Sequence, residues 1–308
     1  MQVIKVTNTA NGLQKVLDSL PMDNKDFIRL ELEPGIYKEK VHILRSNLII
    51  TGTGANPRDT IITYDDEAFQ LMEDGSKRGT FRSYTLFLDA HDVTLHNLTI
   101  RNESTDETID GQGIALYAEG NNLHFENVHL IGRQDTLFTG PLPPKELQPQ
   151  GFIGPKQFAP RINGTQYYKD CYICGNIDFI FGSATAYFDN CTIESIPRSG
   201  SADSDKGYVC APSTPEGQKE GYTFLNCHFI SSYCKDNTCY LARPWRNYAK
   251  AVFLNCDMGS HIHPDGFHDW NKKDAHDSIF FATKNCTRAS SPFVPTAEFA
   301  KIYTSIES

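Results

Sequence analysis

Three polar segments interrupt apolar stretches of this sequence and carry the side chains best suited to chemistry. They are GRQDTLFTG with Gln134 and Asp135, GNIDFIFG with Asp178, and LARPW with Arg243 and Trp245. An ionised carboxylate among apolar residues must be paired, and the planar fork of arginine binds a carboxylate at two points. Asp178 and Arg243 therefore fit a structural ion pair and a catalytic one equally well.

A second carboxylate favours the catalytic interpretation. Two neighbouring carboxyl groups do not ionise together readily, so one tends to keep its proton while the one paired with arginine stays charged. Such a pair supplies a nucleophile and an acid. Gln112 and Gln134 add side-chain amide donors, which are the kind of group that stabilises a tetrahedral oxyanion.

Short strand-like segments recur through the chain and indicate how such distant residues can meet. Each contains Asn or Asp followed by Cys or an apolar residue, and the segments are LHNLTI, FENVHL, YKDCYI, FDNCTI, FLNCHF, FLNCDM and TKNCTR. They return at intervals of roughly 20 to 43 residues, and most alternate apolar and polar side chains with the period of a β-strand. This pattern predicts an all-β chain folded as a parallel β-solenoid.

The same repeat predicts what its Cys and Asn residues do. Equivalent positions stack in a solenoid, so we expect the recurring cysteines to stack in the interior instead of binding metal or serving redox chemistry. These cysteines are Cys171, Cys191, Cys227, Cys256 and Cys286. The Asn or Asp before each of them is expected to turn the backbone or to form a ladder.

Three segments depart from the strand pattern. Four apolar residues near the start have the spacing of one helical face and precede a proline: Leu13, Val16, Leu17, Leu20 and Pro21. They predict a short N-terminal helix that caps the first coil. Residues 140–164 are rich in proline and predict a long loop. The tail, from about 290 to 308, is expected to pack across the outside of the coils, and residues 1–308 to form a single domain.

The charge balance excludes some partners. The 308 residues include 29 Lys and Arg against 38 Asp and Glu, a net charge of −9, which argues against nucleic acid. No apolar run approaches the roughly 18 residues of a membrane span. Residues 1–12 lack the apolar core of a secretory signal, so we expect a cytoplasmic monomer with unpaired thiols, or a secreted protein if a leader has been removed.

Several other residues are assigned structural roles. His261 and His263 are expected in a surface loop, and no metal site is predicted there or elsewhere. Asp65 and Asp66 are expected in a solvated loop. For Trp270, packing within a loop is favoured over a place at the rim of a substrate site.

Five motifs in this order resemble those of the pectin methylesterases, the pectinesterase family. They are GIYKEKV at 35–41, QGIAL at 112–116, QDTLF at 134–138, GNIDFIFG at 175–182 and LARPW at 241–245. The resemblance covers most of the chain and implies a right-handed parallel β-helix that hydrolyses methyl esters of galacturonate. Ala242 stands where the family usually has glycine, and the loop at 140–164 is longer than in plant members, so it is expected to shorten or wall off the groove.

The resemblance also implies a role for each site residue. Asp178 would attack the ester carbonyl at C6 and form an acyl-enzyme, and Asp135 would protonate methanol and then activate water. Gln112 and Gln134 would stabilise the oxyanion, and Arg243 would orient Asp178. Three aromatic residues would border the sugar groove: Trp245, Phe181 and Phe138. The partner would be methylesterified pectin or an oligogalacturonide, with no metal or organic cofactor.

Two alternatives keep the solenoid but change the function. One is a pectate lyase or polygalacturonase, which would need a calcium-binding acidic cluster or three aspartates with a GHG segment, and the sequence contains no GHG. The other is a catalytically inactive carbohydrate-binding solenoid. The presence of every expected catalytic residue argues against the latter.

Overall fold

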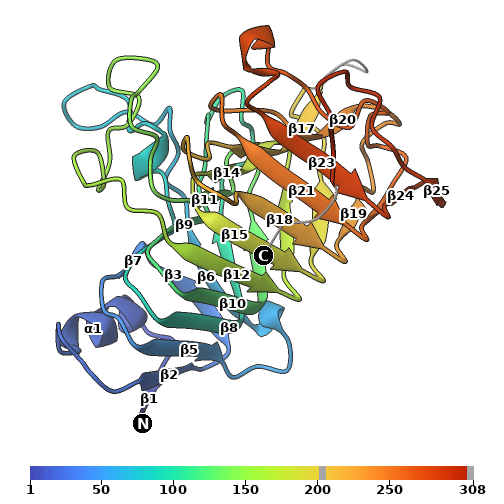
Figure 1. The fold of residues 1–308 in the computed structure, drawn as a ribbon. Helices are drawn as coiled ribbons and strands as arrows, with labels where there is room; N and C mark the ends of the chain where they lie inside the picture. The colour runs from blue at the N-terminus through green and yellow to red at the C-terminus, as the bar shows by residue number, and fades with distance from the viewer. Residues whose placement is uncertain (201–205, 304–308) are drawn as a thin grey trace.

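The computed structural model describes residues 1–200 and 206–303. Its body is a parallel β-helix, in which successive coils stack along one axis and each coil contributes strands to the same faces (Figure 1). The pairing forms three parallel ladders, which we call the first, second and third ladder. The predicted parallel β-solenoid is confirmed.

The first ladder runs the whole length of the molecule. Its strands, in order, are β1 (Gln2–Val6), β2 (Ile28–Leu32), β5 (Leu48–Gly52), β8 (Val93–Asn102), β10 (Leu123–Ile131), β12 (Thr165–Lys169), β15 (Thr185–Asp189), β18 (Tyr222–Leu225), β21 (Lys250–Leu254), β23 (Phe280–Lys284) and β26 (Lys301–Ile302).

The second ladder adjoins the first because β8 and β10 bend and contribute to both. It contains β3 (Gly35–Lys38), β6 (Thr60–Tyr64), the second halves of β8 and β10, β13 (Tyr172–Gly175), β16 (Thr192–Ser195), β19 (His228–Ile230), β22 (Asp257–Met258) and β24 (Thr287–Arg288). A short strand, β25 (Ser291–Pro292), pairs with β24 in the antiparallel direction.

The third ladder forms a separate sheet. Its strands are β4 (Val41–Ile43), β7 (Leu86–Asp89), β9 (Leu116–Glu119), β11 (Leu137–Thr139), β14 (Ile177–Gly182), β17 (Gly207–Pro212) and β20 (Cys239–Ala242). In the described part of the chain, the connections contain three single turns of 3₁₀ helix: η1 (Pro57–Asp59), η2 (Thr80–Arg82) and η3 (Lys273–Ala275).

The repeated Asn or Asp makes the corner between the first and second ladders. All seven have a left-handed backbone with φ between 52° and 55°: Asn97, Asn127, Asp170, Asn190, Asn226, Asn255 and Asn285. Asn and Asp tolerate this conformation better than other non-glycine residues. Their side chains also bond from coil to coil, as where Asn127 Nδ2 donates to Asn97 Oδ1 at 2.9 Å. Both predicted roles, the turn and the ladder, are confirmed.

The residues that follow these corners fill the interior. The five recurring cysteines are buried, and all nine cysteines of the chain are unbridged. Aromatic rings stack in the same core with the spacing of the coils, and Phe224 lies 4.5 Å from Phe188 and 4.8 Å from Phe253 between ring centroids. Parallel register places like residues above one another, so the apolar side chains form one continuous core.

Both ends of this core are covered. The helix α1 (Gly12–Ser19) buries Leu13 and Leu17 against the first coils, as predicted, and its first turn donates to the carboxylate of Glu39. At the other end Phe293 and Phe299 join the core, and β26 adds to the first ladder. The tail therefore closes the last coil instead of lying outside it, because its two aromatic rings bury apolar surface there; residues 304–308 lie outside the described residues.

The proline-rich segment 140–164 is a long loop between β11 and β12 that stands beside the third ladder (Figure 1). Lys156 anchors it through a 2.9 Å ion pair with Asp89, and lies 3.6 Å from Glu119. Arg161 donates to four carbonyl oxygens within the loop. These contacts hold the loop against the coils.

Candidate active site

Successive coils of the third ladder bring the predicted polar residues together. Asp135 precedes β11, Asp178 lies within β14, and Arg243 follows β20. Backbone hydrogen bonds join these coils at the site itself: the amide of Asp135 donates to the carbonyl of Ile177 at 3.1 Å. The two aspartates, 43 residues apart in the chain, therefore lie on adjacent coils on one face.

Both aspartates have a left-handed backbone, with φ of 65° at Asp135 and 47° at Asp178. The pairing of β14 with β17 also shifts register between Ile177 and Ile180. A bulge of this kind redirects a side chain out of the regular alternation of the strand. This irregularity explains how a carboxylate within the apolar run IDFIF leaves the core.

Asp178 and Arg243 form a bidentate ion pair. The guanidinium donates from Nε to Oδ1 at 2.7 Å and from Nη2 to Oδ2 at 2.6 Å. The rings of Tyr208 and Trp270 each lie 3.7 Å from the guanidinium carbon. The side chains of Arg243 and Asp178 are only 13% and 10% exposed, so the pair is rigid and largely shielded from water.

The two carboxyl groups are held in different electrostatic surroundings. Burial raises the pKa of Asp178, and the charge and hydrogen bonds of Arg243 oppose that rise. Burial raises the pKa of Asp135 well above its ordinary value, and the negative charge of Asp178 raises it further. The arrangement favours an ionised Asp178 beside a protonated Asp135.

A cavity of about 550 Å³ opens over these groups. Its walls come from the coils, from the long loop and from the segment after β20. The lining residues are Thr80, Phe81, Gln112, Gln134, Asp135, Leu147, Gln148, Gly151, Phe152, Asp178, Phe181, Ala211, Arg243, Trp245, Arg246, Trp270 and Lys272.

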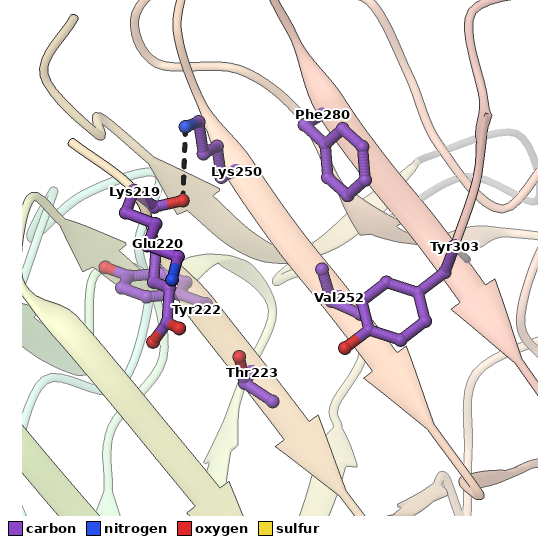
Figure 2. A pocket seen from close by; sticks show the side chains of 9 residues that line it. Lys219, Glu220, Tyr222, Thr223, Lys250, Val252, Phe280 and Tyr303 are labelled. Carbon is purple, nitrogen blue, oxygen red and sulfur yellow. Dashed lines mark hydrogen bonds between the residues drawn. The ribbon is translucent and has the colours of Figure 1, made fainter. Parts of the chain in front are cut away.

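A second cavity, of about 240 Å³, lies on the first ladder between β18, β21, β23 and Tyr303 (Figure 2). Its single lining carboxylate, that of Glu220, accepts a hydrogen bond from Tyr187. The ammonium of Lys250 donates to backbone carbonyls of Gln218 and Lys219. None of the predicted catalytic residues lines this cavity, so the candidate active site is the one on the third ladder.

Comparison with known proteins places the chain in a family. A model of the pectinesterase family matches residues 4–141 and 161–295. The chain belongs to the pectinesterase family. The internal stretch that the model does not match, residues 142–160, falls within the long loop of this pectinesterase-family chain.

Individual relatives and solved structures agree with this assignment. Pectinesterase QRT1 of Arabidopsis thaliana is 29% identical over 293 residues, which cover 92% of this chain and 69% of that protein. Pectinesterase A of Dickeya chrysanthemi is 30% identical over 300 residues, covering 87% and 74%. A pectin methylesterase from Yersinia enterocolitica has a TM-score of 0.74 at 26% identity, covering 94% and 93% of the two chains.

A crystal structure of a pectin methylesterase in complex with a hexasaccharide is also similar. Its TM-score is 0.75 at 26% identity, and the match covers 94% of this chain and 87% of that one. The carrot enzyme has a TM-score of 0.77 at 21% identity, covering 98% and 88%, which bears on the fold alone. The right-handed parallel β-helix is thus confirmed.

Most of the predicted site residues of this pectinesterase-family chain line the cavity. Gln112 and Gln134 lie on neighbouring coils, joined by the hydrogen bond from the amide of Gly113 to the carbonyl of Gln134 at 3.1 Å. The Trp245 ring packs 5.7 Å from that of Phe181, between centroids, at the cavity wall. Leu147, Gln148 and Phe152 come from the long loop, which walls the cavity on one side as expected.

Phe138 does not border the cavity. Phe138 pairs in register with Phe181 on the adjacent coil, but the side chain of Phe138 is fully buried. The ring packs 5.0 Å from Phe81 and 4.9 Å from Phe181. The prediction that it contacts substrate is wrong, because Phe81 covers it; Phe138 supports the cavity wall from behind.

Trp270 was assigned to loop packing, and the structure places it in the cavity against Arg243. Its backbone is left-handed, with φ of 54°, an uncommon conformation for a bulky residue that tends to mark functional sites. Three further residues at the site were not predicted from the sequence: Tyr208, Arg246 and Lys272. Neither Trp270 nor Lys272 stands in a strand repeat, so periodicity offered no signal for them.

Two further expectations are corrected. His261 is only 3% exposed, and burial lowers its pKa to about 4, because the segment at 259–267 folds onto the last coils instead of forming a solvated loop. Asp66 is also buried, where it pairs with Lys40 and Arg78. Within the described part of the chain no group of three potential metal ligands occurs, and no helix is long and apolar enough to span a membrane.

Proposed function

We propose that this protein hydrolyses the methyl esters of galacturonate units in pectin or its oligomers and releases methanol. The observation that supports this most is the pair of buried aspartates in one cavity, of which only Asp178 is paired with arginine. Family membership and the pectin methylesterase names of the relatives support the same reaction. They favour it over a lyase, a glycosidase or an inactive sugar-binding solenoid.

The first half of the reaction is acyl transfer. The Asp178 carboxylate attacks the C6 carbonyl, and its electron pair forms a new C–O bond while the carbonyl oxygen becomes an oxyanion. The side-chain amides of Gln112 and Gln134 line the cavity and stabilise that oxyanion. The tetrahedral intermediate collapses, Asp135 gives its proton to the departing methoxide, and methanol leaves an acyl-enzyme anhydride.

The second half returns the enzyme to its starting state. The Asp135 carboxylate, now ionised, removes a proton from water, and the hydroxide attacks the galacturonyl carbonyl of the anhydride. Breaking the bond to Asp178 releases the free galacturonate and restores the carboxylate that Arg243 holds. The same two oxyanion donors serve both steps. The proton that Asp135 takes from water replaces the one it gave to methanol, and the newly formed carboxyl group of the product loses its proton to solvent.

Aromatic residues position the sugar in this proposal. Trp245, Trp270 and Phe181 line the cavity, where the guanidinium of Arg246 lies over the Trp245 ring and that of Arg243 over the Trp270 ring. Aromatic side chains offer apolar surface on which the C–H faces of a sugar ring pack. The substrate then lies across the mouth of the cavity with its ester directed toward Asp178.

A product assay on methylated oligogalacturonides separates the candidate functions. The purified protein is expected to release methanol with no new reducing ends and no unsaturated, ultraviolet-absorbing product. New reducing ends would indicate a glycosidase, and ultraviolet absorbance a lyase. Sugar binding without any product would point to the inactive solenoid and contradict the proposal.

Arg243→Lys is expected to lower kcat about 100-fold, the scale of a misplaced reacting group. Lysine keeps the charge but has no planar fork to hold both oxygens of Asp178. Weaker stabilisation of the carboxylate raises its pKa, so the acid limb of the pH–rate profile moves to higher pH. The exposed Arg58 provides the control Arg58→Lys. An unchanged kcat and acid limb would show that the Asp178–Arg243 pair is only structural.

A further inference from the structure

Two cysteines that do not belong to the recurring set lie together where the chain enters β20. Cys234 is in the connection between β19 and β20, and Cys239 is the first residue of β20. All nine cysteines lie in the described part of the chain; Cys234 is half-buried and the other eight are buried. Neither Cys234 nor Cys239 lines the active-site cavity, and the proposed reaction does not use them.

The four residues between these cysteines form a turn. Its tip, residues 235–237, is exposed, and Asn237 has a left-handed backbone with φ of 62°. The hydroxyl of Thr238 donates to the carbonyl of Lys235 at 2.8 Å, which closes the turn. The chain therefore comes back on itself and brings the two thiols to the same place.

Both thiols converge on Ser195 of β16. Cys234 Sγ donates to the Ser195 carbonyl at 3.5 Å, and the Cys239 thiol is hydrogen-bonded to the Ser195 side chain. The two thiols also hydrogen-bond to each other. A disulfide joins its sulfur atoms at about 2.05 Å, and thiols that already touch reach this separation by rotation of their side chains.

The two thiols differ in access to solvent and in acidity. Cys239 is 2% exposed, whereas Cys234 is half-buried. The hydrogen bond with Cys239 lowers the pKa of Cys234 to about 7, although burial opposes this. The same contact raises the pKa of Cys239, and burial raises it further. Because the thiolate is the reactive form of cysteine, Cys234 is the thiol suited to react first.

The recurring cysteines have similar contacts without the access. Cys191 and Cys227 hydrogen-bond to each other from coil to coil, but all five recurring cysteines are at most 4% exposed. Burial raises the pKa of Cys191 well above its ordinary value. Exposure and thiolate character decide which cysteines are oxidised, so the recurring set is protected and the pair at the start of β20 is not.

We propose that Cys234 and Cys239 form a reversible disulfide when the protein is exposed to hydrogen peroxide. The Cys234 thiolate attacks one peroxide oxygen, the O–O bond breaks, and the hydroxide that leaves takes up a proton and becomes water. The sulfur of Cys239 then attacks the sulfenic acid on Cys234, loses its proton, and displaces a second water as the S–S bond forms. Two thiols are oxidised, one peroxide is reduced to two waters, and a dithiol reductant reverses the change.

The first test treats fully reduced wild-type protein with hydrogen peroxide in the presence of a metal chelator, and counts thiols after denaturation. The number of free thiols is expected to fall by two from the nine of the chain, and dithiothreitol should restore it. Peptide mapping should place the new bond between Cys234 and Cys239. Nine remaining thiols, or a bond that joins other cysteines, would overturn the inference.

The second test uses Cys239→Ser to separate the two steps. Serine keeps a hydrogen-bond donor toward the Cys234 thiolate but cannot form a disulfide. The sulfenic acid on Cys234 should therefore persist, and dimedone should trap at least about tenfold more of it than in wild-type protein. Equal trapping in the two proteins would show that Cys239 does not react with the sulfenic acid, and would contradict the proposal.

Cys174→Ser is the matched control. Cys174 is a buried, unbridged cysteine of β13 that belongs neither to the pair nor to the recurring set, so this variant should form the Cys234–Cys239 disulfide as wild-type protein does. Loss of the disulfide in Cys174→Ser would assign the reaction to a different thiol. None of these measurements depends on methanol release, so their failure would leave the proposed function standing.

Discussion

Asp178→Asn is expected to lower the rate of methanol release by at least about 10⁴-fold, the scale of removing a nucleophile from an enzyme that acts through a covalent intermediate. The amide of asparagine has no ionised oxygen with which to attack an ester. Arg243 keeps its stacking between Tyr208 and Trp270, so the cavity is expected to keep its shape. The rate is measured as methanol released from methylated oligogalacturonide at saturating substrate.

The choice of asparagine separates chemistry from backbone strain. Asp178 has φ of 47°, a conformation that asparagine adopts about as readily as aspartate and alanine adopts less readily. The matched control is Asp170→Asn, an exposed aspartate with φ of 55° that lies outside the cavity, and it should leave the rate unchanged. Activity within tenfold of wild type in Asp178→Asn would remove Asp178 from the nucleophile's role.

Asp135→Asn is expected to lower methanol release by about 10³-fold, within the range for loss of a general acid–base group. Asparagine cannot give a proton to the leaving methoxide or take one from water. The acyl-enzyme should therefore form more slowly from a methyl ester. An activated ester, whose leaving group departs more readily than methanol, should restore the formation of the acyl-enzyme more than its hydrolysis. Release of the activated leaving group in a single turnover measures the first step, and its slower release in later turnovers, which must wait for hydrolysis of the acyl-enzyme, measures the second.

The same variant is expected to make the protein more stable at neutral pH. Burial and the charge of Asp178 raise the pKa of Asp135 well above the 3.8 of an ordinary aspartate. The contribution of Asp135 to stability is then complete below pH 3.8 and is lost as the pH rises through the higher pKa of the folded state. Asparagine has no such loss, so Asp135→Asn should raise the free energy of unfolding at pH 7.

Asp92 provides a control, because its pKa is shifted in the direction opposite to that of Asp135. Hydrogen bonds from Asn122 and His91 lower its pKa, so its favourable contribution is present at neutral pH and is lost as the pH falls through the lowered pKa. Asp92→Asn should therefore not stabilise the protein at pH 7. Urea unfolding at pH 7 and at pH 4 measures both variants. Equal or lower stability of Asp135→Asn at pH 7 would show that Asp135 is not held in its protonated form.

The fold could be predicted from the sequence because the residues that specify it are neighbours in the chain and recur in every repeat. A left-handed corner requires Asn or Asp, the interior next to it requires a small apolar residue, and the pair recurs in seven segments from Asn97 to Asn285. The helix α1 was also recognisable, since the residues it buries follow its own period. The tail was not, because its two anchoring rings belong to no repeat.

The site was predicted in part for the same reason. Asp178 stood out because a charge within a buried strand requires a partner, and Arg243 was the cation suited to it. Trp270 and Lys272 carried no such signal, because their distance from Asp178 depends on how the segment after β20 folds back over the coils. Phe138 and Phe181 have equivalent positions in β11 and β14, and only the ring of Phe81 above them decides which one reaches the cavity.

By itself, then, the amino-acid sequence determined the stacked coils and the two carboxylates of the third ladder, because strand period and the cost of burying a charge act on neighbouring residues. Only the tertiary structure decided how deeply the two carboxylates are buried, which rings face the cavity and where Arg246 and Lys272 lie. Those properties depend on burial and on charges brought close across coils and loops, and both change steeply with distances that the order of residues does not contain.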